Sequence, residues 1–488
     1  MRGMTLERIA EAVDGRLVYP KGDADGRTAC RDGAAAEKGA AEASEIITDS
    51  RKAGPGTVFA AIRGEHSDGH DYIGQVFEKG AMGVICEKVP DDAAGPCIAV
   101  DDTLKALRLL ARYYREQMSK VRIVGIVGSV GKTSTKELVA SVLEQRFNTL
   151  KTEGNFNNEL GVPLTIFRLR DEHEAAVVEM GINHFGEMDR LGEIVKPDAV
   201  VFTNVGPCHL EFLKDLDGVL RAKSEVFKHV RAGGTLILNA EDEKLSGVRD
   251  VPGLSIVRYG SGGDICAENV VNMGLRGTEA DILYHTGPWM ANGDGDTSSV
   301  GRFHAMVHLP GAHMVLNSLA ATAAGLMFGM DPEEIAAGIA AAQPMSGRSR
   351  LIDTGRLLLL DDCYNANPKA DCAAIDLMMS AAGRKIAILG DMFELGENAA
   401  ILHAEVGRYA ATHGIDMLVC VGELSDNMYD AAKEADGGCE ACYFGTLDDL
   451  IDNVGSLGLT EGDTVLVKAS HGMNFSKLVE KIRSLYAE

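Results

Sequence analysis

The chain has 488 residues, with 48 lysines and arginines against 72 aspartates and glutamates, so its net charge is −24. At roughly 100 to 200 residues per domain, this length predicts about three domains, each with its own core. The negative charge argues against nucleic acid as a partner, because phosphate backbones are bound by basic surfaces. Apolar residues make up 45 % and charged residues 25 %, as in ordinary globular proteins, which excludes global disorder.

No apolar run reaches the roughly 18 to 20 residues that a membrane span needs. The longest candidate, Met314 to Met330, is rich in alanine and glycine and carries Asn317, Ser318 and Thr322, which predicts a buried helix. The first residues lack the continuous apolar core of a secretion signal. We therefore expect a cytoplasmic protein without a membrane span, and we take it to act as a monomer.

Ten cysteines are scattered along the chain, and six of them lie in or beside apolar segments, which favours reduced core thiols over disulfides. These six are Cys86, Cys97, Cys208, Cys363, Cys372 and Cys420. The only CxxC pair, Cys439 and Cys442, has no second pair or histidines at ligand spacing, so it does not predict a zinc site.

The first domain is expected to end at residue 115. Residues 20–44 are rich in glycine, alanine and charge without apolar periodicity, which predicts a solvent-exposed insertion. Residues 45–64 predict short strands broken at Pro55 and Gly56, and residues 71–88 predict a helix that runs into a strand. These elements indicate a small α/β domain over residues 1–115.

The second domain is expected over residues 116–345. It opens with an apolar strand, a glycine-rich turn and a helix, in the order RIVGIVG, GSVGKTS and KELVASVLEQRF. Further apolar strands, AAVVEMG, DAVVFTNV and GTLILN, alternate with helical stretches, which indicates a parallel sheet covered on both faces. Residues 264–309 have few helix signals and many glycines, which predicts a β-rich segment. Helices are expected to follow at 313–328 and 332–342.

A second series of strands and helices predicts a third domain over residues 346–488. Its strands are expected at LLLLDD, KIAILGD, MLVCVG and TVLVKAS, and we place the boundary near residues 344–347. No repeat period is visible, which argues against a solenoid. The predicted fold class is thus α/β, with a small first domain, a central parallel-sheet domain and a C-terminal Rossmann-like domain.

The turn between the first strand and helix of the central domain has the composition of a phosphate-binding loop. It comprises Gly128, Ser129, Val130, Gly131, Lys132, Thr133 and Ser134. Free backbone N–H groups at a helix N-terminus favour phosphate, and the two glycines let the backbone approach it closely. Lys132 would reach the β- and γ-phosphates of ATP, and the Thr133 hydroxyl would bind Mg²⁺. Ile126 stands where the general Walker pattern has glycine, so the loop is GxxGKT.

Polar residues follow the other strands at the edge where doubly wound sheets bind ligands. Glu179 ends one strand, with Asn183 and His184 shortly after it, and His209 follows the next. Together with the phosphate loop, Glu179 and His209 become candidate ligands for a second Mg²⁺ near the γ-phosphate. Lys223 lies on a helix with a buried face, and its residue context alone also allows a surface lysine paired with Glu225 or Glu211.

These motifs resemble those of the Mur ligases of peptidoglycan synthesis, almost from end to end outside residues 20–44. The matching stretches are residues 48–73, GSVGKTS, TEGNFNNELGVP, VVEMGINHFGEMDRL, NVGPCHLEF, RAKSEVF, DDCYNANPKA and ILGDMFELGE. DDCYNANP followed by LGDMFELG is specific within the family. It matches the member that joins D-alanyl-D-alanine to UDP-N-acetylmuramoyl-tripeptide.

The resemblance implies a UDP-recognition domain, an ATPase domain and a mobile C-terminal domain, and it implies roles for residues that match the family's motifs. Ser50 and Arg51 would lie at the uridine nucleotide. Thr152, Asn157 and Asn158 would contact the muramoyl peptide or shape the loop that holds it. The remaining matches are Glu179 and His209 as Mg²⁺ ligands, Lys223 as a lysine that is carbamylated in several members, Asn317 beside adenine, and Arg348 and Asp362 as groups that reach ATP on closure.

Two departures stand out. KASHGMNF replaces the usual Gly-Ser-Arg-Gly sequence, so His471 takes the place of an arginine. The second departure is the insertion at residues 20–44, so the resemblance does not define how the uridine pocket is bordered. The implied cofactors are ATP and Mg²⁺, with two ions expected. The implied reaction is ATP-driven amide formation through an acyl phosphate, with either meso-diaminopimelate or lysine as the third residue of the acceptor peptide.

Two other functions compete with this one. A sister ligase that adds another amino acid, or a ligase like folylpolyglutamate synthase, would use the same fold, but DDCYNANP argues against both. A regulatory or transport-coupling P-loop ATPase would use the phosphate loop only to switch conformation. The two classes differ in phosphate release, which in a ligase requires both peptide substrates and in a switch ATPase requires ATP alone.

Overall fold

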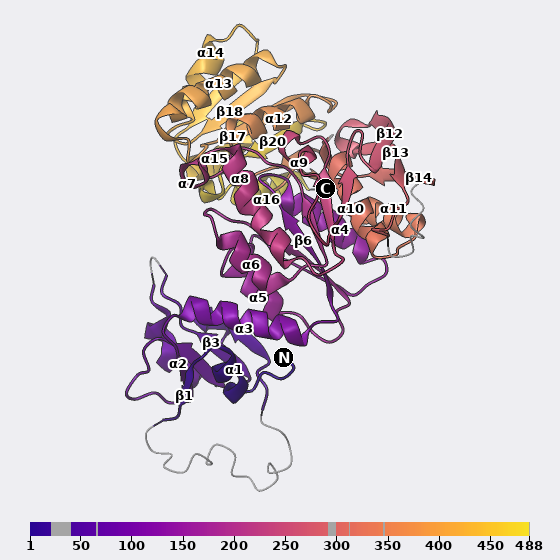
Figure 1. Cartoon of the computed structure of the whole chain (residues 1–488). Coiled ribbons are helices and arrows are strands. Elements are labelled where there is room, and N and C mark those ends of the chain that lie inside the picture. Colours follow the sequence, from indigo (N-terminus) through magenta and orange to yellow (C-terminus); the bar gives the residue numbers. More distant parts are fainter. Residues whose placement is uncertain (21–40, 65–66, 291–298, 312, 345–346, 488) are drawn as a thin grey trace. The chain divides into compact units, whose positions relative to one another are not determined.

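The computed structural model describes residues 1–20, 41–64, 67–290, 299–311, 313–344 and 347–487 (Figure 1). The chain divides into two compact units. The first comprises residues 1–267, 282–303 and 317–338, and the second comprises residues 268–281, 304–316 and 339–488. The described residues form three sheets, of five, nine and six strands, which confirms the α/β class.

The five-stranded sheet has the order β1-β5-β4-β3-β2, in which only β1 pairs antiparallel. Its strands are β1 (Arg16–Val18), β2 (Glu45–Ile47), β3 (Thr57–Ala60), β4 (Gly83–Cys86) and β5 (Cys97–Ala99). The accompanying helices are α1 (Leu6–Ala12), α2 (Ile73–Glu78) and α3 (Thr103–Gln117), with 3-10 turns at Ser50–Lys52 and Gly69–Tyr72. Short strands around Pro55 and a helix before β4 were predicted, and both are confirmed.

The expected insertion at residues 20–44 falls mostly on residues 21–40, which lie outside the described residues. Its far end is not solvent-exposed as predicted. Ala43 is fully buried and its N–H donates to the Met4 carbonyl at 2.8 Å, so the chain has already rejoined the core there. The sequence did not show this, because the segment has no apolar periodicity that would mark a buried face.

The nine-stranded sheet has the order β14-β13-β12-β11-β10-β9-β6-β8-β7. Its strands are β6 (Arg122–Val127), β7 (Thr149–Lys151), β8 (Ala175–Glu179), β9 (Ala199–Phe202), β10 (Thr235–Asn239), β11 (Ser255–Tyr259), β12 (Ile265–Asn272), β13 (Thr278–His285) and β14 (Val300–Val307). The predicted strands are confirmed, and the predicted β-rich segment at residues 264–309 contains β12, β13 and β14. The neighbours of β6 are β8 and β9, both parallel to it, so the ends of these three strands meet at one edge.

The helices of this region begin with α4 (Lys132–Leu143), directly after β6. The others are α5 (Gly161–Phe167), α6 (Glu187–Val195), α7 (Leu210–Leu213), α8 (Leu216–Lys223), α9 (Glu243–Ser246), α10 (His313–Met327) and α11 (Pro332–Ala341), with 3-10 turns at Ser224–His229 and Gly274–Arg276. Strands β8, β9 and β10 are buried at every position, as a sheet covered on both faces requires. The helices predicted at 313–328 and 332–342 are α10 and α11.

The six-stranded sheet of the second unit has the order β15-β16-β20-β17-β18-β19, parallel except for β15. Its strands are β15 (Arg350–Asp353), β16 (Leu358–Asp361), β17 (Lys385–Gly390), β18 (Met417–Val421), β19 (Glu440–Phe444) and β20 (Thr464–Lys468). The helices are α12 (Pro368–Met378), α13 (Ala399–Thr412), α14 (Asp426–Glu434), α15 (Leu447–Asn453) and α16 (Ser476–Tyr486), with 3-10 turns at Gly396–Asn398, Val454–Leu457 and His471–Met473.

Alternate residues of β17 enter two different apolar cores. Ile386 and Ile388 pack in one, and Ala387 and Leu389 pack in the other. The sheet is therefore buried on both faces, which explains why its strands have unbroken apolar sequences. The four strands predicted here are β16, β17, β18 and β20.

The nine cysteines in the described part of the chain are all free thiols, and Cys86, Cys97, Cys363 and Cys420 are buried. This confirms the predicted reduced thiols, but Cys208 and Cys372 are half-buried and do not belong to the core as predicted. Within the described ranges, no helix has the length and apolar composition needed to cross a membrane.

Candidate functional site

The glycine-rich turn joins β6 to α4 and requires glycine at two positions. Gly131, at φ +80°, is the N-cap of α4, and no side chain caps the first-turn N–H groups there. Gly128 has φ +147°, and a Cβ at this residue would lie 2.0 Å from Thr203 Oγ1. Uncapped N–H groups at a helix N-terminus bind anions, so the turn has the local geometry of a phosphate site.

Residues at the end of β9 hold this turn in place. The N–H of Val130 donates to Asn204 Oδ1 at 2.9 Å, and the Val130 carbonyl accepts from Thr203 Oγ1 at 2.7 Å and from Asn204 Nδ2 at 3.0 Å. Ser129 Oγ donates to the Gly206 carbonyl at 3.1 Å. The sequence reasoning did not single out Thr203 or Asn204. The polar pair directly after a buried strand was the available signal.

The remaining residues of the turn continue into the first turn of α4. Lys132 Nζ donates to the carbonyls of Gly128 and Ser129 at 3.0 and 3.3 Å. Thr133 is buried, and Ser134 is half-buried. The buried residue Asn317 lies beside the turn, because its Oδ1 is 3.9 Å from where a Cβ on Gly131 would be. The structure thus brings the predicted adenine-side residue close to the phosphate loop.

Glu179 ends β8 and is almost completely buried, with 2 % of its surface exposed. Its Oε1 accepts from Asn157 Nδ2 at 2.8 Å, and its N–H donates to Thr152 Oγ1 at 3.0 Å. Its Oε2 is buried and has no hydrogen-bond partner. A buried carboxylate oxygen without a donor is costly unless a cation meets it, so the donor set here fits a hard metal ion.

Beside Glu179 lies a cavity of about 430 Å³, which is lined by several of the predicted site residues of the central domain. Its lining includes Ser129, Lys132, Asn157, Asn158, His209 and Lys223. Thr152 is 1 % exposed, so its side chain shapes the loop and is not open to a ligand. The cavity therefore brings together the phosphate loop, the loop after β7 and the segment after β9.

Lys223 is the last residue of α8 and is 1 % exposed. The alternative of a surface lysine paired with Glu225 is wrong, since Glu225 instead accepts the N–H groups of Gly186 and Asp189 at the start of α6. Burial, followed by the charge of Lys132, lowers the pKa of Lys223 to about 8. A fraction of this amine is consequently neutral near neutral pH, the form that reacts with carbon dioxide to give a carbamate.

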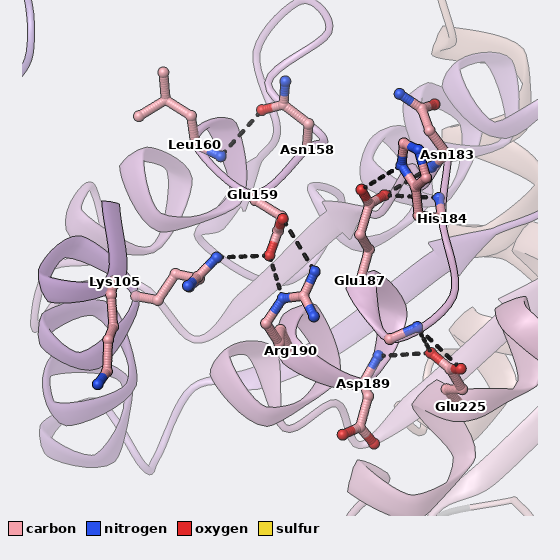
Figure 2. A network of polar contacts seen from close by, with 12 residues as sticks. Lys105, Asn158, Glu159, Leu160, Asn183, His184, Glu187, Asp189, Arg190 and Glu225 are labelled. Atoms are coloured by element: carbon pink, nitrogen blue, oxygen red, sulfur yellow. Dashed lines mark hydrogen bonds and ion pairs between the residues drawn. The ribbon is translucent and has the colours of Figure 1, made fainter. Parts of the chain in front are cut away.

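The loop after β8 and the start of α7 complete the rim of the cavity. His209 is exposed and has φ +51°, an uncommon conformation for a residue other than glycine. Glu187 accepts from the N–H groups of Asn183 and His184 at 2.7 and 3.2 Å, and it lies 3.1 Å from His184 Nδ1 (Figure 2). Asn183 and Glu187 line the cavity, and His184 belongs to the same loop.

Among the described residues, no three His, Cys, Asp or Glu side chains lie together as a metal cage. This is compatible with Mg²⁺, which is held by one or two carboxylates plus substrate phosphates and water. Of the predicted metal ligands, Glu179 fits by its partnerless oxygen. The hydroxyl of Thr133 lies in the adjoining turn.

In the second unit, the predicted ATP-contacting residues are parts of one cluster. The Arg348 guanidinium lies 4.1 Å from the centre of the Tyr364 ring, and its Nε is buried without a hydrogen-bond partner. Asp362 accepts from the Ser349 N–H at 2.7 Å and from Lys468 Nζ at 2.6 Å. His471, the departure from the family pattern, contacts Tyr364 with ring centres 5.2 Å apart. Sequence reasoning missed Tyr364 and Lys468.

Ser50 and Arg51 lie in the 3-10 turn after β2, away from the lining of the cavity described above. Arg51 is exposed and forms a two-pronged contact with Asp49, with Nε–Oδ1 and Nη2–Oδ2 distances of 2.9 and 2.7 Å. The hydrogen bonds from Arg51 lower the pKa of Asp49 to about 2. The Asp49 contact therefore fixes the orientation of an exposed Arg51 side chain.

The chain matches three sequence profiles that cover most of its length. They are described as the Mur ligase family catalytic domain, over residues 42–115, the Mur ligase middle domain, over residues 126–325, and the Mur ligase glutamate ligase domain, over residues 347–471. The chain therefore belongs to the Mur ligase family, as the motifs led us to expect.

Three relatives that match the chain over most of its length are named for one ligase. The UDP-N-acetylmuramoyl-tripeptide–D-alanyl-D-alanine ligase of Haemophilus influenzae is 34 % identical over 397 residues, which are 80 % of this chain and 83 % of the relative. MurF from Acinetobacter baumannii has a TM-score of 0.86 and 30 % identity over 99 % of each chain. MurF from Thermotoga maritima, solved with ADP, has a TM-score of 0.73 and 26 % identity over 90 % of this chain and 97 % of that one.

Proposed function

We propose that this protein is an ATP-dependent ligase that adds D-alanyl-D-alanine to UDP-N-acetylmuramoyl-tripeptide in the synthesis of peptidoglycan precursors. The observation that carries the proposal is the combination at one sheet edge of an uncapped glycine-rich loop, Lys132 and the partnerless carboxylate oxygen of Glu179. The full-length relatives named for this activity support it.

The reaction joins two anions before it forms an amide. The terminal carboxylate of the tripeptide attacks the γ-phosphorus of ATP, the bond from that phosphorus to the ADP oxygen breaks, and an acyl phosphate forms. The amine of D-alanyl-D-alanine then attacks the acyl carbon, inorganic phosphate leaves, and the nitrogen loses one proton. Since this amine has an ordinary pKa of about 7.7 to 8.0, part of it is nucleophilic at neutral pH and no strong base is needed.

The residues of the central cavity would make the first step possible by neutralising charge. Lys132 and the N-terminus of α4 would hold the phosphates of ATP, and Asn317 would lie on the adenine side. Glu179, the Thr133 hydroxyl, His209 and a carbamylated Lys223 would hold Mg²⁺. Bound there, Mg²⁺ would supply the positive charge that lets the carboxylate approach the γ-phosphate. The protein's net charge of −24 makes this local positive charge necessary.

The other substrate groups are assigned to the loops around the cavity and to the two remaining domains, taken as residues 1–115 and 346–488. Ser50 and Arg51 would bind the uridine nucleotide, and Asn157 and Asn158 would face the muramoyl peptide. Arg348 and Asp362 would reach ATP when the C-terminal domain closes and keeps water from the acyl phosphate. A crosslink that locks the domains in one arrangement should abolish turnover, and full activity in such a protein would overturn the closure step.

We further infer two Mg²⁺ ions, a monomer and a cytoplasmic location. The number of ions is measured by titrating the protein and ADP with Mn²⁺ and following the free ion by electron paramagnetic resonance. Light scattering at several concentrations gives the oligomeric state. Fractionation of cells of the source organism tests the location.

The experiment that tests the function measures phosphate release and product mass together. Protein, ATP and Mg²⁺ are incubated with UDP-N-acetylmuramoyl-tripeptide, with D-alanyl-D-alanine, and with both. A ligase releases phosphate only with both, and the tripeptide forms with lysine and with meso-diaminopimelate identify the acceptor. Steady phosphate release with ATP alone would favour a switch ATPase and overturn the proposal.

Replacement of Lys132 tests the phosphate loop within the same assay. Lys132→Ala should eliminate turnover while the far-ultraviolet circular dichroism and melting temperature stay close to those of the wild type. Lys244→Ala, on α9, is the matched control, because its side chain pairs with Asp217 and lies outside the cavity. Near-normal turnover in Lys132→Ala would refute the assignment of the loop.

A further inference from the structure

The segment between β7 and α5 carries Asn157 and is held from two sides by an ion-pair cluster. Glu159 Oε1 accepts from Arg108 Nη1 at 2.8 Å and from Arg190 Nε at 2.5 Å, and Oε2 accepts from Arg190 Nη2 at 3.2 Å (Figure 2). Arg108 lies on α3 and Arg190 on α6. One carboxylate therefore connects this segment to two helices that are 51 and 31 residues away in the chain.

Glu159 has the properties of a fixed anion. It is about a fifth exposed, and it lines the same cavity as Lys132 and Lys223. Burial raises the pKa of Glu159, but hydrogen bonds from Arg190 and the charges of Arg190 and Arg108 outweigh burial and lower it. The carboxylate thus stays ionised, and a two-pronged contact with arginine fixes its orientation as well as its charge.

Asn157 and Asn158 connect the fixed side chain of Glu159 to Glu179. Asn158 Oδ1 accepts the N–H groups of Leu160 and Gly161 at 3.2 and 2.8 Å, at the start of α5, which begins two residues after Glu159. The Asn157 carbonyl accepts the Gly181 N–H at 2.8 Å, and Asn157 Nδ2 donates to Glu179 Oε1 at 2.8 Å. A single residue, Asn158, therefore separates the ion-pair cluster on Glu159 from the Asn157 contact that orients the buried carboxylate.

We propose that Glu159 is a positioning residue, which holds residues 155–160 between α3 and α6 so that Asn157 fixes Glu179 Oε1 and leaves Oε2 to a divalent cation. This inference rests on the proposed function for the identity of the cation. Loss of Glu159 would leave Glu179 in place but free to rotate, because the amide that fixes it would move with its loop. Residues that orient a metal ligand typically change metal affinity or activity by about 10- to 100-fold when they are removed.

The chain supplies a matched control for this inference. Arg112 on α3 contacts Glu193 on α6, one helical turn beyond the Glu159 cluster, and this pair links the same two helices without touching residues 155–160. Glu193→Gln therefore weakens the packing of α3 on α6 alone. Glu159→Gln weakens it and also releases the loop. The difference between the two variants isolates the positioning role from simple stabilisation.

The experiment measures divalent-cation binding separately from turnover. Mn²⁺ is titrated into protein saturated with ADP, and free Mn²⁺ is followed by electron paramagnetic resonance, with melting temperatures recorded in parallel. We expect Glu159→Gln to weaken Mn²⁺ binding at least about 10-fold, Glu193→Gln to change it less than about 2-fold, and Glu159→Asp to restore part of the affinity. If Glu159→Gln does not fold, Arg190→Lys gives the same comparison, since it keeps the charge but loses the two-pronged contact.

A double variant tests the route through Asn157. If Glu159 acts through this amide, Asn157→Ala combined with Glu159→Gln should bind Mn²⁺ no more weakly than Asn157→Ala alone. Additive losses, or equal losses in Glu159→Gln and Glu193→Gln, would overturn the inference. Wild-type protein that binds Mn²⁺ but forms no product would overturn the proposed function alone. Wild-type protein that binds no Mn²⁺ would overturn both the inference and the metal part of the proposal.

Discussion

Two buried carboxylates, one in each unit, are left with partnerless oxygens for opposite reasons. Glu179 has one oxygen held by Asn157 and the other without a donor, beside a cavity. Asp371, on α12, is fully buried, and neither of its oxygens has a hydrogen-bond partner. Its nearest cation is Lys468, whose Nζ lies 3.9 Å from Asp371 Oδ1. A buried carboxylate can therefore be kept ready for a ligand or kept neutral by its surroundings.

Asp371 differs from Glu179 because the cation nearest to it, Lys468, is hydrogen-bonded to other groups. Lys468 Nζ donates to Asp362 Oδ2 at 2.6 Å and to the Asn365 carbonyl at 2.8 Å, so its ammonium is already satisfied. Burial raises the pKa of Asp371 to about 7, although Lys468 opposes this shift, and Asp362 adds to it. Asp371 is therefore protonated, and so uncharged, below about pH 7.

The largest effect in the comparison of Glu179 with Asp371 is expected from removing the charge of Glu179. Glu179→Gln keeps the shape of the side chain but removes its charge. The turnover of the ligase reaction should therefore fall by about 1000-fold, as expected when a metal ligand worth several kcal/mol is lost. The melting temperature should stay the same or rise, because the substitution removes a buried charge that has no hydrogen-bond donor at Oε2. The exposed Glu172→Gln, three residues before β8 begins, serves as the control. An active Glu179→Gln enzyme would show that this carboxylate only supports the fold.

The next effect is expected at Lys468, on the stability of the second unit. Lys468→Met should lower the free energy of unfolding by about 3–5 kcal/mol, since removing one partner from a buried ion pair leaves the other charge unpaired. Urea denaturation measures this value, with Lys477→Met, at an exposed position on α16, as the control. A loss below about 1 kcal/mol would mean that Asp362 is stabilised mainly by the Ser349 N–H and not by Lys468.

The sequence predicted the elements whose signals are local. Strands such as β6, β8 and β17 have continuous apolar runs because both faces are buried, and the phosphate loop has glycines because its backbone requires them. The strands that were not predicted, β7, β15 and β19 among them, are short or half-exposed and carry polar residues. Edge strands of this kind are stabilised by pairing with a neighbour, which leaves little trace in their own residues.

The candidate site shows the same limit at the level of single side chains. Glu179, His209 and Lys223 could be proposed because they follow strands or match a motif. Asp371 could not, since an aspartate in the first turn of a helix ordinarily faces water and favours the helix dipole. Its burial results from the packing of α12 against β20, a contact between residues about 90 positions apart. Asn204 and Glu159 were missed for the same reason, because their roles depend on partners distant in the chain.

The smallest effect is the pH dependence of stability that Asp371 should cause. The pKa of Asp371 is about 7 in the folded protein, against about 3.9 in an unfolded chain. The folded state then binds more protons than the unfolded state between these values, so stability must fall as pH rises through 7. Between pH 6 and pH 8 the expected loss is about 1–2 kcal/mol. Asp371→Asn stays neutral and should remove this loss, which makes the variant more stable than the wild type above pH 7.

Urea denaturation at pH 6, 7 and 8 measures this difference directly. The matched control is Asp376→Asn, an exposed position on the same helix, which should keep the wild-type slope even if its contact with Tyr409 is lost. Wild-type stability that is level between pH 6 and pH 8 would mean that Asp371 is ionised in the folded protein. In that case Lys468 would balance two carboxylates at once, and the contrast with Glu179 would rest on the cavity alone.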